Sequence, residues 1–211
     1  LIIDEEQKFG VEQKELLKKQ FPELDILITT ATPIPRTLHM GFSNLLDLSV
    51  LSTPPEGRLP VRTILSKYDD EVIRNAIYKE VKRAGQVFYV HPRIQGIETE
   101  AKRVASLING LRVAVVHGRM ASDTIENVMH DFYERKYDVL VSTNIIGSGL
   151  DFQNVNTIIV NRADMFGLAE LYQLRGRVGR SRINGYAYFL FPSLTNVPLD
   201  VKKKMDILYR H

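Results

Sequence analysis

Short runs of valine, isoleucine and leucine recur along this chain, and segments with a helical spacing of apolar residues separate them. Apolar runs without alternation are typical of strands that helices cover on both faces of a sheet. Strands that alternate with helices favour a parallel sheet with right-handed crossovers. The sequence therefore predicts an α/β fold with a doubly wound parallel sheet. We expect strands at 1–3, 25–29, 61–65, 86–90, 113–116, 139–141, 157–160 and 187–191, and helices at about 11–20, 70–81, 97–108, 122–132, 167–175 and 199–209.

Side chains that can cap helices stand before two of the predicted helices. Asp69 or Asp70 can cap the helix that continues to about residue 81. Ser122 can cap the helix that carries Met129 and Phe132 inward. These caps predict where the two helices begin.

A proline-rich stretch divides the chain. Residues 53–60 read Thr-Pro-Pro-Glu-Gly-Arg-Leu-Pro and show no periodicity, which is typical of a linker. We expect one domain to end at residue 52 and a second to span 61–192, with 193–211 beginning a helical extension. Because the chain opens directly on the apolar run 1–3, we also expect the preceding part of the first sheet to lie outside this sequence.

The composition excludes several kinds of protein. The 211 residues contain no cysteine, which rules out disulfides and thiolate metal sites. No apolar run approaches the ~20 residues of a membrane-spanning helix, and no signal-peptide pattern opens the chain, so we expect a cytoplasmic location. The net charge of +3 is compatible with a nucleic-acid or nucleotide partner without requiring one.

The segment 173–180, Gln-Leu-Arg-Gly-Arg-Val-Gly-Arg, indicates a phosphate ligand. The guanidinium groups of Arg175, Arg177 and Arg180 stay charged, and their planar shape matches two phosphate oxygens at once. The two glycines keep side-chain bulk away, so a ligand or a second domain can approach the backbone. The alternative for these eight residues alone is a solvated, basic end of a helix.

Polar residues gather where predicted strands end. They are Asp4-Glu5, Thr30-Ala31-Thr32, His117-Gly118-Arg119, Ser142-Thr143 and Asp151. Ligands of open parallel sheets bind beside the carboxyl ends of the strands, so we expect these clusters to share one edge. Asp4 can hold Mg²⁺ directly or through water, and Glu5 can orient and deprotonate an attacking water. The alternative for this pair is a solvated helix start, where acidic side chains are favoured.

The segment 142–151 combines hydroxyl side chains with glycines directly after a strand. Backbone amides and hydroxyls in such a turn suit phosphates, and Asp151 can accept from a ribose hydroxyl, although an ordinary glycine loop is the alternative. His91 and His117 each follow a strand without a second histidine or carboxylate at metal-ligand spacing, so we predict no zinc site. The aromatic residues fall at core spacing and are assigned to packing rather than to base stacking.

Taken in order, these motifs resemble motifs II to VI of the superfamily-two helicases and translocases. The matching segments are Asp-Glu-Glu-Gln at 4–7, Thr-Ala-Thr-Pro at 30–33, the linker, His-Gly-Arg-Met at 117–120, Ser-Thr-Asn at 142–144 and Gln-x-x-Gly-Arg-x-Gly-Arg at 173–180. The resemblance covers nearly the whole chain. Within this superfamily the chain resembles the bacterial transcription-repair coupling factors most, through segments 9–11, 32–38, 47–49, 53–55 and 162–169. The RecG family of branch-migration helicases shares the arginine segment and 32–38, but Asp47-Leu48-Ser49 and Thr53-Pro54-Pro55 favour the coupling factors.

This resemblance implies RecA-like motor lobes. Residues 1–52 would be the C-terminal part of the first lobe, with motifs II and III, and 61–192 the second lobe, with motifs IV to VI. It also implies ATP and Mg²⁺ as cofactors and double-stranded DNA as the track, gripped through its phosphates in a sequence-tolerant and salt-sensitive way. Further implied partners are RNA polymerase, nucleotide-excision-repair proteins and the missing part of the first lobe, which carries the phosphate-binding loop.

The resemblance also implies roles for individual residues. Its catalytic residues would be Asp4, which holds Mg²⁺, Glu5, Gln7, Gln173, Arg177 and Arg180. The nucleotide would contact Gly149, Asp151, Arg177 and Arg180, and DNA would contact His117, Gly118 and Thr143. Thr30, Ala31 and Thr32 would couple hydrolysis to movement. Arg175 has no implied role.

Two segments depart from the family pattern. Many relatives have an acidic residue and a threonine before the glycine of motif V, where this chain reads Gly147-Ser148-Gly149, so tight coupling through this segment is not implied. The sequence His91-Pro92-Arg93 differs from the more usual asparagine-bearing motif IV, so no role is carried over to it.

The chain contains no Gly-x-x-x-x-Gly-Lys-Ser/Thr sequence, the phosphate-binding loop of such ATPases. Arginine fingers act on a nucleotide that another lobe holds. We therefore expect this chain alone to bind ATP weakly and to hydrolyse none measurably. The resemblance implies that the full-length protein is an ATP hydrolase and translocase that displaces stalled RNA polymerase. Two other functions stay open: a RecG-like branch-migration helicase, and a DNA- or partner-binding module without turnover.

Overall fold

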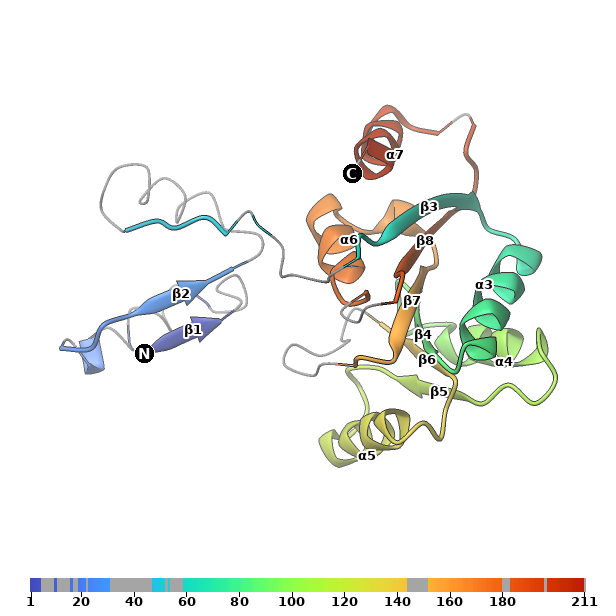
Figure 1. Cartoon of the computed structure of the whole chain (residues 1–211), viewed down its shortest axis with the longest axis horizontal. Helices are drawn as coiled ribbons and strands as arrows, with labels where there is room; N and C mark the ends of the chain where they lie inside the picture. Colours follow the sequence, from blue (N-terminus) through green and yellow to red (C-terminus); the bar gives the residue numbers. More distant parts are fainter. Residues whose placement is uncertain are drawn as a thin grey trace. The chain divides into compact units, whose positions relative to one another are not determined.

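The computed structural model describes residues 1–4, 10, 16, 19–21, 23–30, 47–51, 53, 59–143, 152–179, 183–195 and 197–210 (Figure 1). The chain forms two compact units, Leu1–Pro54 and Pro55–His211. The boundary between them falls inside the proline-rich stretch 53–60. Each unit is described by itself below.

The described residues of the second unit form a six-stranded sheet in which every neighbouring pair of strands is parallel. Its strands are β3 (Arg62–Lys67), β4 (Gln86–Val90), β5 (Val113–Val116), β6 (Val139–Ser142), β7 (Val155–Val160) and β8 (Tyr186–Phe191), in the spatial order β3-β8-β7-β4-β6-β5. Every residue of β4, β6 and β7 is buried, which explains why apolar residues predominate in these strands without alternating with polar ones.

Helices cover both faces of this sheet (Figure 1). On one face, α3 (Asp70–Lys82) and α4 (Ile97–Ser106) share a core with β4, β6 and β7. On the other face, α5 (Ser122–Tyr133), α6 (Leu168–Arg175) and α7 (Leu199–Arg210) pack against the opposite side chains of the same strands. The predicted α/β fold with a doubly wound parallel sheet is thereby confirmed.

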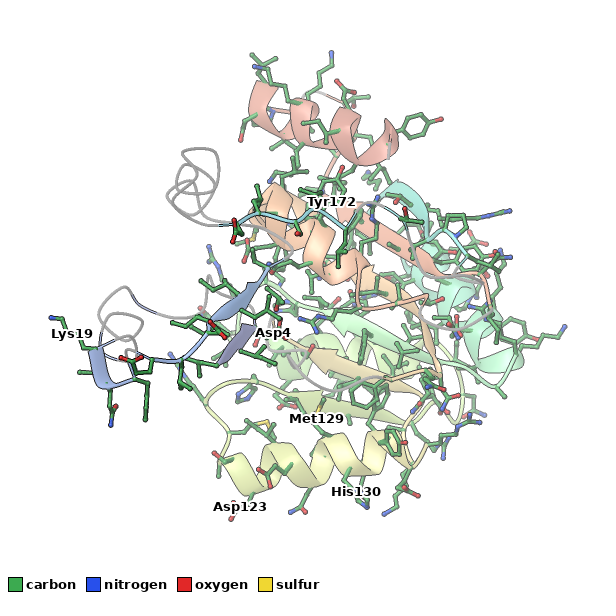
Figure 2. All side chains as sticks on the ribbon, turned by 60° about the vertical axis from the view of Figure 1, so that its left-hand side comes forward. Asp4, Lys19, Asp123, Met129, His130 and Tyr172 are labelled. Carbon is green, nitrogen blue, oxygen red and sulfur yellow. The ribbon has the colours of Figure 1, made fainter. Side chains whose placement is uncertain are left out.

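One of the two predicted caps is wrong. The Asp69 carboxylate accepts from the Glu71 N–H at 2.7 Å and caps α3 as expected. Ser122 does not cap α5, because α5 begins at Ser122 itself and Ala121, with extended backbone, occupies the N-cap position without a side-chain hydrogen bond. The inward face of α5 is as predicted: Met129 is buried between the helix and the sheet, whereas His130 is exposed (Figure 2).

The last helix, α7, is anchored to the second unit by apolar and polar contacts. Val201 and Leu208 are buried in the same core as α5 and α6. Lys204 Nζ donates to Phe166 O at 2.5 Å and to Asp164 O at 3.1 Å, beside the 3₁₀ turn η2 (Ala163–Met165). A lysine that reaches the last carbonyls of a helical turn satisfies acceptors that the turn itself leaves open. The hydroxyl of Tyr172, labelled in Figure 2, donates to the carbonyl of Ile207 at 3.5 Å and joins α6 to α7.

The first unit contains a two-stranded parallel sheet in its described residues. β1 (Ile2–Asp4) pairs with β2 (Leu27–Thr29), with Ile2 opposite Leu27 and Asp4 opposite Thr29. The helix predicted for 11–20 lies mostly outside the described residues, of which 16, 19 and 20 are helical. Across the described parts of both units, no helix is long and apolar enough to span a membrane.

Candidate functional site

The carboxyl ends of the six parallel strands of the second unit lie together, and they form one edge of its sheet. His117 and Gly118 follow β5 at this edge, and Thr143 follows β6, the neighbouring strand. The Arg119 N–H donates to His117 Nδ1 at 3.3 Å, so the neutral ring carries its proton on Nε2. Gly118 and Arg119 are exposed. The structure therefore brings the three predicted DNA-contacting residues to adjacent strand ends, where backbone and side-chain donors suit a phosphate chain.

A second turn that contains a histidine follows β4, which lies on the opposite side of β6 from β5. His91 Nδ1 lies 2.7 Å from Arg93 O and 3.4 Å from Arg93 N, so the ring contacts the backbone of its own turn. Both histidines thus bind back to their own turns. Among the residues that the structure describes, no group of three His, Cys, Asp or Glu side chains could hold a metal ion.

The arginine segment begins inside α6. This helix starts at a capping contact in which the Gly167 N–H donates to Glu170 Oε2 at 2.7 Å. Leu171 and Leu174 face the core, while Gln173 and Arg177 are half-buried. The predicted arginine Arg180 lies outside the described residues.

Arg175, which had no predicted role, is held by the protein itself. Its guanidinium carbon lies 4.5 Å from the centre of the Tyr172 ring, and its Nη1 donates to Thr63 Oγ1 of β3 at 3.5 Å. Burial lowers the pKa of Arg175 below its ordinary value, although the side chain stays charged at neutral pH. Arg175 therefore anchors the end of α6 to β3.

The same edge of the sheet holds a partly buried polar network that sequence reasoning missed. Glu100 Oε1, in the first turn of α4, accepts from the hydroxyls of Tyr89 and Tyr68 and from Asn161 Nδ2, the last two at 3.2 Å. Arg103 reaches Glu100 through two nitrogen atoms, at 2.9 and 3.1 Å. The network joins α4 to the ends of β3, β4 and β7. The pair Glu100 and Arg103, three residues apart on a helix, was its one signal in the sequence.

Ionisation in this network is set by burial and by hydrogen bonds. Burial alone would raise the pKa of the Glu100 carboxyl, but hydrogen bonds from Arg103, Tyr89 and Tyr68 outweigh it and hold that pKa below its ordinary value. Burial, together with the Glu100 charge, raises the pKa of Tyr89 well above its ordinary value. At neutral pH the network therefore contains a carboxylate, a guanidinium and neutral phenols, which fixes the position of α4 at this edge.

In the first unit, Asp4 ends β1 and Thr30 follows β2. Thr29 donates its hydroxyl to Asp4 Oδ1 at 2.6 Å, which orients the carboxylate at the carboxyl end of the two strands. Asp4 is exposed. The other predicted site residues of this unit, Glu5, Gln7, Ala31 and Thr32, lie outside the described residues, as do Gly149 and Asp151 of the second unit.

A pocket of about 190 Å³ lies at the opposite edge of the second sheet. It is lined by Gln86, Tyr133, Phe152, Gln153 and Asn154, which stand at the start of β4, the end of α5 and the approach to β7. Because the predicted site residues of this unit follow the carboxyl ends of the strands, this pocket is separate from them.

The family model for the helicase conserved C-terminal domain matches residues 69–182, more than half of the chain. The chain belongs to the helicase C-terminal domain family. This match contains α3 to α6 and the arginine segment, and it ends just after Arg180.

Longer bacterial proteins match almost the whole chain. Over 208 residues, which are 99% of its length, this chain is 50% identical to the transcription-repair-coupling factor of Myxococcus xanthus and 47% identical to that of Escherichia coli (strain K12). The matches cover 17% and 18% of these two relatives, so the chain spans less than a fifth of their length. The resemblance to transcription-repair coupling factors is confirmed.

A solved structure supports the same family. RecG bound to a three-way DNA junction has a TM-score of 0.76 and 31% sequence identity with this chain, over 99% of this chain and 27% of RecG. The predicted RecA-like architecture is confirmed by this likeness together with the parallel sheet.

Proposed function

We propose that this chain is part of an ATP-dependent motor that moves along double-stranded DNA. Residues 1–52 are the C-terminal part of its first RecA-like lobe, 53–60 the linker between lobes, 61–192 the second lobe and 193–211 the start of a helical extension. The observation that carries the proposal is the near-50% identity to transcription-repair-coupling factors over 99% of the chain. The location of predicted contact residues at adjacent ends of parallel strands supports it.

ATP and Mg²⁺ are the proposed cofactors, and the described residues fit them. The Asp4 carboxylate and the Thr29 hydroxyl, 2.6 Å apart, are the hard oxygen ligands that Mg²⁺ prefers, and Mg²⁺ is commonly held by one or two carboxylates plus the phosphates of the substrate. When bound, the ion neutralises phosphate charge.

Different side chains of this chain have different proposed roles toward the nucleotide. Glu5 orients and deprotonates the attacking water, and Gln7 contacts the terminal phosphate or the facing lobe. Gln173 acts together with the finger arginines of its segment. Arg177 and Arg180 stabilise the charge that develops during phosphoryl transfer. Gly149 and Asp151 meet the nucleotide, and the segment Thr30–Thr32 couples hydrolysis to movement.

DNA is the proposed track. His117, Gly118 and Thr143 contact its phosphate backbone from the ends of β5 and β6. Contacts of this kind carry no base information, so binding is tolerant of sequence and weakens as salt rises.

The proposed role of the full-length protein is to displace stalled RNA polymerase and to support repair with nucleotide-excision-repair proteins, in the cytoplasm. The relatives of this chain are transcription-repair-coupling factors, which supports this role. A RecG-like branch-migration helicase is the second candidate, favoured by the TM-score of 0.76 to RecG on a three-way DNA junction. We rank it second because the identity to RecG is 31%, against 50% to the M. xanthus factor.

Displacement of a triplex-forming oligonucleotide from duplex DNA tests the motor activity. We expect the full-length protein to displace the oligonucleotide with ATP and Mg²⁺ but not with a non-hydrolysable analogue. We also expect DNA affinity to fall by roughly 10³-fold or more between 50 and 200 mM salt, as for a protein with about six to ten phosphate contacts. A protein that binds duplex DNA but neither hydrolyses ATP nor displaces the third strand would be a binding module instead. Activity on forked DNA with none on a stalled RNA polymerase would favour the RecG-like candidate.

A further inference from the structure

The last but one residue of the arginine segment is a buried glycine with an unusual backbone. Gly179 has φ of +69°, in the left-handed region that residues with a Cβ atom adopt at a cost. The residue before it, Val178, is completely buried. The path of the chain from Arg177 to Gly179 is therefore set by this turn rather than by the helix.

Two glycine backbones meet at this turn. A Cβ atom built on Gly185 would lie 2.9 Å from Gly179 Cα, and such a distance does not occur between real side chains and backbone. The backbones of residues 179 and 185 thus lie in close contact. The Gly185 carbonyl accepts from the Arg62 N–H at 2.8 Å, so this contact is tied to the start of β3.

Val61, the residue before β3, lies against both glycines. Its Cγ2 methyl would be 2.8 Å from a Cβ atom on Gly179 and 3.1 Å from one on Gly185. Val61 is half-buried and packs against the main core of the second unit. The methyl therefore fills the space that the two missing side chains leave.

The start of β3 consequently holds the arginine segment at two points. Thr63 accepts from Arg175, and Val61 packs on Gly179. Arg177 lies two residues from each of these anchors. We propose that Val61 is a positioning residue: its contact with Gly179 and Gly185 sets where Arg177 projects toward the nucleotide, and it links the end of the linker to the arginine segment.

This inference rests on the proposed ATP hydrolysis, and replacement of Val61 in the full-length protein tests it. Displacing a catalytic group by ~1 Å can cost ~100-fold in rate. Loss of one packing contact should move Arg177 by less than this distance. We therefore expect Val61→Ala to lower DNA-stimulated turnover at saturating ATP about tenfold. The KM for ATP and the affinity for DNA should stay near the wild-type values, because finger arginines act mainly in the transition state. Val61→Thr keeps the branched shape and should restore most of the turnover.

The matched control is Val128→Ala. Val128 is also a half-buried valine packed against the main core, but it lies on α5. An equal fall in turnover for Val61→Ala and Val128→Ala would overturn the proposal, since it would show only a general loss of packing. Should Val61→Ala melt below the assay temperature, Val61→Leu, which keeps the volume but moves the branch away from the glycines, carries the same prediction. A wild-type protein without DNA-stimulated turnover would instead refute the proposed function.

A mutant cycle with Gly179 gives a second readout. Gly179→Ala should lower turnover by itself, since alanine is strained at a positive φ and its Cβ atom meets Val61. If Val61 acts through Gly179, adding Val61→Ala should lower turnover little further, because both changes disturb one contact. Fully additive losses would contradict the proposal.

Discussion

Replacing Arg180 by alanine in the full-length protein should reduce ATP turnover by at least ~10³-fold, the lower end of what arginine fingers contribute. The loss should appear at saturating ATP, since the guanidinium stabilises charge that develops only in the transition state. DNA affinity should change little. Steady-state hydrolysis with duplex DNA present, together with a DNA-binding titration, measures both quantities.

Two further variants sharpen this prediction. Arg180→Lys keeps the charge but loses the planar fork, and we expect it to recover only a small part of the turnover. Arg74→Ala, at an exposed arginine on α3 that pairs loosely with Glu71 at 3.7 Å, should leave turnover unchanged. A parallel loss of DNA binding in Arg180→Ala would move this residue from the nucleotide to the DNA track.

Replacing Glu80 by alanine should destabilise the second unit by about 3 kcal/mol, in the range found when one partner of a buried pair is removed. Glu80 is 1% exposed, and its carboxylate accepts from Arg83 through two nitrogen atoms, at 2.5 and 3.1 Å. The hydroxyl of Thr157, which is also buried, donates to the same carboxylate at 2.5 Å. Removing Glu80 leaves this hydroxyl without its partner in a space that water does not reach. The free energy of unfolding in urea measures the loss.

An exposed glutamate on the same helix provides the control. Glu71→Ala removes a solvent-exposed ion pair with Arg74 and should change the free energy of unfolding by less than ~0.5 kcal/mol. Equal losses for Glu80→Ala and Glu71→Ala would show that the buried carboxylate contributes nothing beyond helix propensity.

Apolar runs were sufficient to predict most of the second sheet. The bounds expected for β4 and β5 match the observed strands, because buried strands flanked by turn residues leave no competing helical pattern. Ser122 was misassigned because a serine at the first position of a helix and one just before it are nearly indistinguishable in sequence. Only the extended backbone of Ala121 decides between them.

The candidate site was predicted in part. His117 and Thr143 could be expected at one edge, since the ends of parallel strands must meet there. The anchoring of Arg175 on Tyr172 and Thr63 could not be expected, because Thr63 is 112 residues away along the chain. The contacts of Glu100 with Tyr68 and Asn161 likewise depend on the strand order, which periodicity does not reveal.

ATP hydrolysis by this 211-residue chain alone, compared with the full-length protein, tests the central claim most directly. The claim is that the chain supplies arginines to a nucleotide whose phosphate-binding loop lies elsewhere in the full-length protein. With duplex DNA and Mg²⁺ present, we expect turnover from the full-length protein and none above background from the chain, whose folding is checked by its melting transition. Steady ATP turnover by the folded chain alone would contradict the account.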